Sequence, residues 1–267
     1  KIFMGIVTFS NQISVASRLG MYYNRDSPVD TSILTLFFKL DNHFFAFLPD
    51  IFSPGGPTLK TIGIVAEYNP FHTGHAWHIR QTRRLFSEET AVVAVMSGSW
   101  VQRGECAVTD KWTRAEMALA GGVDLVLELP TVWATSSAEG FARGAVSILA
   151  ATGVVDVLSF GSECGEIAPL RELSRCLNSP DFSRALRREL DGRRSFAHCR
   201  RQAAARLLGE ETAALIDFPN NSLGVEYLRF LPSGIEAVTV PRQGTEHDGE
   251  TAEEFASASL LRRWIRA

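Results

Sequence analysis

Residues 60–75 read KTIGIVAEYNPFHTGH, an apolar run that leads through polar residues to two histidines. The apolar run, Thr61–Ala66, is typical of a strand that is buried on both faces of a parallel sheet. A helical pattern follows at Gly74–Phe86. His72 and His75 lie where the predicted strand passes into the predicted helix, in an HxGH motif. We therefore predict a ligand-binding turn between a central strand and a helix.

Beyond this segment, short apolar runs alternate with helical patterns. Four further strands are expected, at Ala91–Met96, Asp124–Leu129, Val154–Phe160 and Glu236–Val240. Four further helical stretches are expected, at Asp110–Ala120 with Asp110 as its N-cap, Ser137–Ala150, the Arg-rich Ala168–Leu208, and Ala252–Ile265. Alternating strands and helices favour a parallel sheet with right-handed crossovers, so the predicted fold class is α/β with a Rossmann-like sheet.

Composition excludes several classes of protein. The 267 residues are 45% hydrophobic and carry a net charge of −3, so nucleic-acid binding requires a local basic patch. The four cysteines form no CxxC pair and no zinc-like spacing with histidine, so we expect reduced thiols and no metal ligands. No apolar run reaches the roughly 18 residues of a membrane span, and the first residues lack the order of a secretory signal. We therefore predict a cytoplasmic protein with no membrane partner.

Residues 1–58 differ in composition from the rest of the chain. They hold 8 of the 17 phenylalanines but only four basic and four acidic residues, and the breakers SPGGP follow at 53–57. We interpret 1–58 as an atypical extension, either poorly ordered or translated from a start placed upstream of a true start near Leu59. A small Phe-rich accessory element is the alternative. The main domain is then 59–267.

The HxGH segment suits the phosphates of ATP. A helix start offers unpaired N–H groups and the positive end of the helix dipole, and Gly74 lets the backbone approach closely. His72 and His75 can both donate hydrogen bonds as negative charge builds at the α-phosphorus and on departing pyrophosphate. In-line displacement then needs no covalent protein intermediate. Two surface histidines are the alternative interpretation, and Glu67 and Asn69 either face the ligand or only form a turn.

Many blocks of the sequence, in order, resemble the tRNA(Met) cytidine acetate ligase family of the HxGH nucleotidyltransferase superfamily. They are GIVAEYNPFHTGH at 63–75, SGSWVQRGE at 97–105, DKWTR at 110–114, GVDLVLELP at 122–130, SAE at 137–139, FGSE at 160–163, PNNSLGVEY at 219–227, and ASAS at 256–259 with Arg262. The likeness spans about 60–262, and the chain stops soon after it. The resemblance therefore implies a nucleotidyltransferase catalytic domain at 59–267 without the family's C-terminal region.

The resemblance also implies a reaction. The family uses ATP to activate acetate as acetyl-adenylate, and moves the acetyl group to N4 of the wobble cytidine of elongator tRNA(Met). It implies that His72 and His75 are the catalytic residues, which hold the phosphates while Mg²⁺ offsets their charge. The nucleotide-binding positions that it implies are Val65, Glu67, Asn69, Phe71, His72, Gly74, His75, Gly161, Asn220, Arg242, Ser257 and Arg262.

Three of these positions also have plainer interpretations. Arg242 follows a predicted strand, where a guanidinium can bind phosphate bidentately, although it could be a solvated loop residue. Asn220 follows Pro219 and could only shape a turn. Arg262 could close the last helix by favouring its negative dipole end.

Basic and aromatic residues nearby leave two interpretations open. Arg103, Lys111 and Arg114 either contact phosphate or tRNA, or lie on a solvated helix face. Trp77 and Trp112 are expected in the core rather than as platforms for stacked bases. The basic residues within 184–206 could contact RNA, although acidic residues are interleaved with them.

Three functions are compatible with these motifs. The first is the acetate-activating tRNA ligase, in which acetyl transfer requires that the shortened chain still binds tRNA. The second is an adenylyltransferase that acts on a small phosphorylated metabolite, as other HxGH proteins do. The third is a truncated nucleotide-binding remnant, which the intact His72, Gly74 and His75 argue against. The sequence predicts no oligomeric state.

Overall fold

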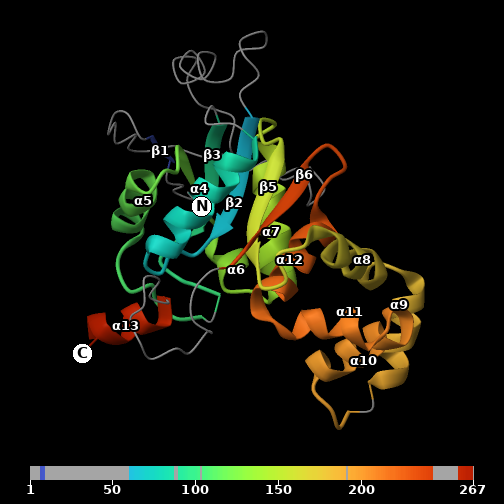
Figure 1. The fold of residues 1–267 in the computed structure, drawn as a ribbon. Coiled ribbons are helices and arrows are strands. Elements are labelled where there is room, and N and C mark those ends of the chain that lie inside the picture. The colour runs from blue at the N-terminus through green and yellow to red at the C-terminus, as the bar shows by residue number, and fades with distance from the viewer. Residues whose placement is uncertain are drawn as a thin grey trace, which may run out of the picture.

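A computed structural model of the chain describes residues 7–9, 60–86, 90–102, 104–190, 192–242 and 258–266. Its centre is a six-stranded sheet in the order β1-β4-β3-β2-β5-β6 (Figure 1). The strands are β1 Val7–Phe9, β2 Lys60–Ala66, β3 Thr90–Ser97, β4 Leu125–Leu129, β5 Val157–Ser162 and β6 Glu236–Pro241. Strands β2 to β6 pair in parallel, which confirms the predicted α/β sheet.

Strand β1 comes from the Phe-rich stretch and was not expected. It pairs antiparallel with β4, with Val7 opposite Leu127, and forms one edge of the sheet. The other residues of 1–58 lie outside the described part of the chain, so the interpretation of that stretch as an extension remains a prediction.

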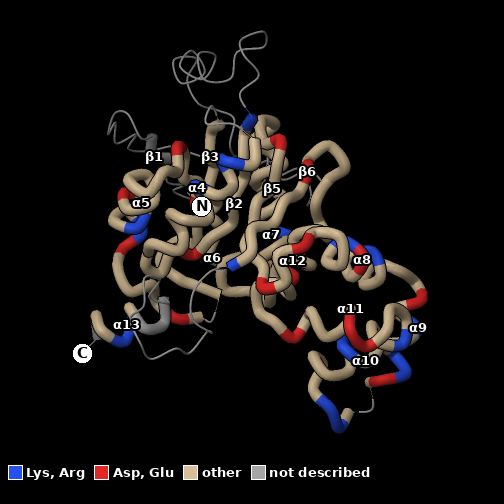
Figure 2. Tube along the Cα trace, viewed as in Figure 1, with Lys and Arg blue, Asp and Glu red and all other residues tan. Residues whose placement is uncertain are grey.

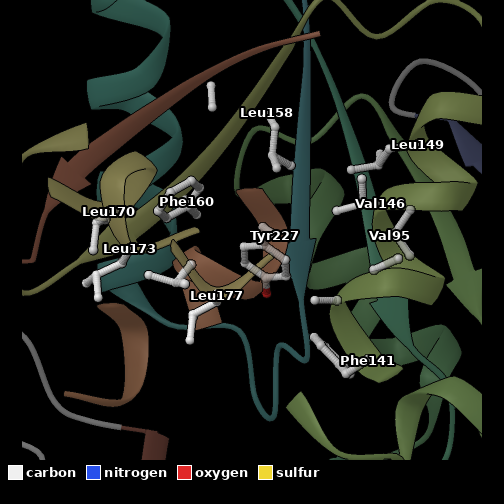
Figure 3. Close-up of a cluster of buried hydrophobic side chains, with 14 of the residues drawn as sticks. Val95, Phe141, Val146, Leu149, Leu158, Phe160, Leu170, Leu173, Leu177 and Tyr227 are labelled. Carbon is white, nitrogen blue, oxygen red and sulfur yellow. The ribbon is translucent and has the colours of Figure 1, made fainter. Parts of the chain in front are cut away.

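Alternate residues of the strands enter two separate cores, as the two-residue period of a strand requires. On one face, Ile62, Ile64 and Val92 pack against α4 (Thr73–Phe86) and α5 (Lys111–Ala120). On the other face, Val95 and Leu158 belong to a larger core beneath α7 (Ala138–Ala151), α8 (Ile167–Leu177) and α12 (Pro219–Phe230). Figure 3 shows this second core, with Tyr227 at its centre.

The remaining helices follow β4 and β5. They are α6 Thr131–Ala134, α7 Ala138–Ala151, α8 Ile167–Leu177, α9 Pro180–Glu189, α10 Phe196–Leu208, α11 Glu210–Ala214, the short 3₁₀ helix η2 Leu215–Asp217, α12 Pro219–Phe230 and α13 Ala258–Arg266. Helices α8 to α11 form a helical lobe beside the sheet (Figure 1). In the described residues, no helix combines the length and the apolar character that crossing a membrane needs.

The expected helical stretch Ala168–Leu208 is three helices rather than one. Ser179 caps α9, because its Oγ accepts a hydrogen bond from the Phe182 N–H and Pro180 occupies the first turn. Ser195 caps α10 in the same way, accepting from the N–H of His198. These serine caps divide the Arg-rich stretch into separate helices, and each buries an apolar face.

The strand order fixes where a ligand can bind. The chain passes from β2 outward through β3 to β4, and then returns to add β5 on the other side of β2. Neighbouring connections therefore leave β2 and β5 in opposite directions, which opens a crevice at their carboxyl ends. The HxGH segment follows β2 directly, so it lies at this switch point.

Candidate functional site

The two histidines of the motif are held in a stack at the carboxyl end of β2. The rings of His72 and His75 lie with centroids 3.7 Å apart at an interplanar angle of 29°. Tyr68 and Phe71 contact the His75 ring, with centroid distances of 4.9 and 5.4 Å. Tyr68 is buried with a φ of 47°, an uncommon left-handed conformation for a bulky residue and one often found at functional sites.

Backbone hydrogen bonds set the tautomer of both rings. The Gly74 N–H donates to His72 Nδ1 at 3.1 Å, and the His72 N–H donates to His75 Nδ1 at 3.2 Å. A ring nitrogen that accepts carries no proton, so the neutral rings carry theirs on Nε2. Gly74 is required here, because a Cβ at that position would lie 2.9 Å from His72 Cε1. The motif thus presents two oriented Nε2–H donors.

Burial and nearby arginines keep these rings neutral. Burial, followed by the charges of Arg242 and Arg262, lowers the pKa of His72 to about 4. Burial also lowers the pKa of His75 well below its ordinary value, with smaller contributions from His72, His78 and Arg242. The histidines are therefore neutral hydrogen-bond donors at neutral pH, and the positive charge of the site resides on guanidinium groups.

Two arginines reach the histidines from distant parts of the chain. Arg242 follows β6, where its N–H donates to the Ser162 carbonyl at 3.0 Å, and its side chain is exposed. Gly161 lies beside it, since a Cβ there would meet Arg242 Cγ at 3.5 Å. Arg262 extends from α13 and donates through Nη1 to the Asn69 carbonyl at 2.8 Å. The sequence-predicted Gly161, Arg242 and Arg262 therefore meet at the HxGH turn.

Glu67 and Asn69 hold the loop that follows β3. The N–H of Gln102 donates to Glu67 Oε1 at 2.8 Å, and the N–H of Val108 donates to Asn69 Oδ1 at 2.7 Å. These side chains therefore hold the loop after β3, at Gln102 and Val108, against the HxGH turn. Val65 at the end of β2 is partly buried in the second core, and Phe71 is partly buried in the first.

Arg114 has a role that neither sequence interpretation anticipated. Its side chain is fully buried, and its guanidinium donates to the carbonyls of Glu67, Gly98 and Thr109. Lys111 pairs with Glu128 at 2.7 Å, and both side chains are mostly buried. The expectation of a phosphate-binding, tRNA-binding or solvated face is therefore wrong for Arg114, whose role is to join the ends of β2 and β3 to the loop before α5.

The start of α12 is tied to the end of β5. Glu163 accepts hydrogen bonds from the backbone N–H groups of Asn220 and Asn221, and from the Asn220 side-chain amide at 2.6 Å. In return, Asn221 Oδ1 accepts from the N–H groups of Glu163 and Cys164. Asn220 lies in the first turn of a helix rather than in a loop turn. Glu163 orients its side-chain amide at the carboxyl end of β5, where Gly161 also lies.

A buried hydrogen-bond chain beneath the site was not predicted. His78 Nε2 lies 3.0 Å from Ser159 Oγ, which lies 2.7 Å from Thr82 Oγ1. His78 is one helical turn beyond His75, so this chain fixes α4 against β5. The only sequence signal for His78 was its spacing of three residues from His75, which places both on one face of a helix. Its partner Ser159 lies 81 residues from His78 in the chain, so the contact could not be predicted.

The remaining candidates fall into two groups. Ser257 and Arg103 lie outside the described residues. Trp77 is partly buried, whereas Trp112 is 42% exposed, so the expectation that Trp112 belongs to the core is wrong. Lys111 lies over the Trp112 ring at 5.6 Å, which orients the indole at the surface.

The lowered histidine pKa values predict how stability depends on pH. An unfolded histidine titrates near 6.5, whereas His72 and His78 in the fold titrate near 4. Between these values the unfolded chain binds more protons, so the free energy of unfolding falls as the pH falls from about 6.5 to 4. We expect urea unfolding to show a smaller decline in the His78→Gln variant, which lacks one of these protonation sites. Equal declines in the two proteins would contradict the prediction.

Comparison with known proteins agrees with this geometry. A family model described as HIGH Nucleotidyl Transferase matches residues 59–267. The chain is 44% identical over 214 residues to a tRNA(Met) cytidine acetate ligase of Caldanaerobacter subterraneus subsp. tengcongensis, covering 78% of this chain and 53% of the relative. It is 41% identical to a protein of the same name from Clostridium botulinum. The chain thus spans about half the length of the curated relatives it matches.

Solved structures give the same result. A crystal structure of Thermotoga maritima TmcAL bound with alpha-thio ATP matches with a TM-score of 0.71 and 41% identity, covering 78% of this chain and 50% of that chain. The apo form of the same protein matches with a TM-score of 0.73. These likenesses confirm the resemblance drawn from the motifs. With a family match over residues 59–267 and the histidine pair at the switch point of the sheet, the chain belongs to the HIGH nucleotidyl transferase family.

Proposed function

We propose that this chain binds ATP at the HxGH turn and activates acetate as acetyl-adenylate. The observation that carries the proposal is the convergence of two neutral, oriented histidines with Arg242 and Arg262 at the carboxyl end of β2. Nε2–H donors and guanidinium groups match a polyphosphate, and the start of α4 adds the positive end of a helix dipole. We propose that the nucleotide also contacts Gly161, which lies beside Arg242.

The proposed chemistry is in-line displacement. A carboxylate oxygen of acetate attacks the α-phosphorus, and the bond to the bridging oxygen of pyrophosphate breaks, with its electron pair leaving on pyrophosphate. His72 and His75 donate hydrogen bonds to the phosphate oxygens as charge builds, and the arginines offset the charge of the leaving group. Neutral donors suit this role because the displacement transfers no proton, so the histidines only need to donate hydrogen bonds.

Magnesium enters the proposal only as part of the substrate, MgATP. In the described part of the chain, no group of three or more His, Cys, Asp or Glu side chains is arranged to hold a metal ion. Mg²⁺ commonly binds through substrate phosphates and water with few protein ligands. The phosphates of ATP and water are therefore the proposed ligands of this Mg²⁺.

The second half of the proposed reaction is acetyl transfer to N4 of the wobble cytidine of elongator tRNA(Met). The amine attacks the acetyl carbonyl, AMP leaves with the electron pair of the broken bond, and the amine loses a proton. The names of the relatives support this acceptor. Because ATP and tRNA meet in the cytoplasm, we propose that location for the protein.

Pyrophosphate release from MgATP tests the proposal directly. We would measure it with and without acetate, with and without elongator tRNA(Met), and with small phosphate esters in place of acetate. Acetate-dependent release supports adenylate formation, and stimulation by tRNA supports the second half. Release that depends on a phosphate ester would indicate an adenylyltransferase instead. ATP binding without release under any condition would indicate a nucleotide-binding remnant.

A further inference from the structure

Positive charge gathers at the far end of the helical lobe. Residues 180–208, which form α9, α10 and the turn between them, hold eight arginines and three acidic residues, whereas the whole chain carries a net charge of −3. Figure 2 shows Lys and Arg segments on both sides of this turn, at the end of the lobe that is farthest from the sheet. A local basic patch of this kind is what nucleic-acid binding requires in an acidic protein.

Most of these arginines have structural roles within the lobe. The nearly buried carboxylate of Glu189 pairs with Arg194 and Arg206. Among the described residues, further ion pairs join Arg200 to Glu226 of α12, Arg201 to Glu210 and Asp217, and Arg184 to Asp181. These charges are already neutralised by the fold, so they cannot account for affinity to an external polyanion.

Arg187 and Arg188 differ from the others. Helix α9 buries Phe182, Ala185 and Glu189, which turns residues 187 and 188 to the solvent. Within the described residues, neither guanidinium has an ion-pair or hydrogen-bond partner. These two cations therefore lie side by side in the sequence with no carboxylate of the described residues to neutralise them.

An aromatic side chain lies exposed beside these charges. Phe196 is the first residue of α10 and is 61% exposed. It begins the helix that follows α9 in the chain, eight residues after Arg188. A solvent-exposed phenylalanine contributes little to the fold, but it offers a flat face on which an unpaired base can stack. A purely electrostatic partner, such as an acidic protein, would not need this ring.

We propose that Arg187, Arg188 and Phe196 form an RNA-binding surface, the lobe-tip surface, in which the arginines contact phosphates and Phe196 stacks on an unpaired base. The inference rests on the proposed function, which makes elongator tRNA(Met) the RNA. It adds a second contact, distant in the fold from the histidines, that would position the tRNA while its anticodon enters the active site.

The lobe is attached firmly enough to the sheet for such positioning. Arg171 on α8 donates to the Ala237 carbonyl of β6, and Asn178 exchanges hydrogen bonds with Arg229 of α12. Helix α12 is in turn bound to the end of β5 through Glu163. An RNA held at the lobe tip therefore has a defined position relative to His72 and His75.

Binding of an elongator tRNA(Met) transcript to the full chain, measured by fluorescence anisotropy over a range of salt, tests this surface. We expect the double variant Arg187→Gln, Arg188→Gln to bind roughly tenfold more weakly near physiological salt, and the slope of log affinity against log salt to fall by about 1.4–1.8 for two lost phosphate contacts. Arg184→Gln is the control on the same helix, because it removes one positive charge at a residue that is paired with Asp181. Circular dichroism checks that each variant folds.

The aromatic contact has its own pair of variants. Phe196→Ala should weaken binding roughly fivefold without changing the salt slope, and Phe196→Tyr should restore it, because stacking needs an aromatic face but no charge. The double variant, Arg184→Gln and the two Phe196 variants are also assayed for acetate-dependent pyrophosphate release without tRNA. None of these substitutions should change that release.

The outcomes separate this inference from the proposed function. Wild-type affinity in the double variant would overturn the lobe-tip surface, and so would equal losses in the double variant and Arg184→Gln. Absence of tRNA binding by the wild-type chain, with acetate-dependent release intact, would overturn the surface and leave adenylate formation standing. Loss of tRNA binding in the double variant without any acetate-dependent release would support the surface and refute the proposed reaction. Equal binding of polyglutamate, with the same dependence on Phe196, would also overturn the RNA assignment.

Discussion

We expect His75→Ala to lower the rate of pyrophosphate release from MgATP by about 10²–10³-fold while the fold is retained. The reason is the loss of one oriented Nε2–H donor at the point where negative charge develops. His75 lies between Tyr68, Phe71 and His72, so its ring has a fixed direction before the nucleotide binds. A donor that needs no reorientation stabilises the transition state more than water does, which is why its removal has a large effect.

A second substitution tests the neutral state of the ring. The Gln side chain places a neutral N–H group near the position of Nε2, so His75→Gln should recover part of the lost rate if hydrogen bonding is the contribution. A requirement for a proton donor of imidazolium type would leave His75→Gln as slow as His75→Ala. His198→Ala, at an exposed position on α10, is the matched control and should retain the full rate. An unchanged rate in His75→Ala itself would place the chemistry elsewhere.

The parallel sheet could be predicted because its strands are buried on both faces. All five predicted strands are present, with ends that differ by three residues or fewer, since apolar runs such as Ala91–Met96 have few other interpretations in a soluble domain. The N-cap Asp110 was also predictable from the sequence, because a side chain that accepts a hydrogen bond from a nearby backbone N–H is a local feature. Local signals and burial on both faces therefore account for most of the fold.

Helix α12 and strand β1 were missed for a physical reason. Helix α12 begins with Pro219-Asn220-Asn221, which has the composition of a turn, and its start is stabilised by Glu163 from 58 residues away. Strand β1 is only three residues long and depends on pairing with β4. Neither element is specified by its own residues alone, so a local pattern could not predict them.

The candidate site divides in the same manner. The HxGH turn is contiguous, so its position was predictable from the sequence, and the resemblance supplied Gly161, Arg242 and Arg262 as distant members. The hydrogen bonds to Asn69 and Glu67 were not predictable, because their partners lie on a loop without regular structure. Arg114 was misread because an arginine on a helix is usually solvated, and only the fold reveals the carbonyls that surround it.

Arg114→Met should lower the free energy of unfolding by about 3 kcal/mol, because three carbonyl oxygens would lose their donor inside the protein. Methionine keeps the length and apolar contacts of the side chain, so the loss reports the hydrogen bonds rather than a cavity. These bonds join Glu67 at the end of β2, Gly98 after β3 and Thr109 before α5. The variant should also raise KM for ATP, since Glu67 directly precedes the segment that carries the histidines.

Urea unfolding of Arg114→Met, Arg114→Lys and Arg184→Met separates the possible causes. Lysine keeps the positive charge but lacks the planar guanidinium that donates to three carbonyls. Arg114→Lys should therefore recover only part of the lost free energy of unfolding. Arg184 is exposed and pairs with Asp181 at the surface, so Arg184→Met should change stability by no more than about 0.5 kcal/mol. If Arg114→Lys were as stable as the wild-type chain, charge alone would explain the role of this residue. If Arg114→Met were no less stable than Arg184→Met, the buried guanidinium would not hold the strand ends together, and the geometry of the HxGH turn would have to depend on Glu67 and Asn69 alone.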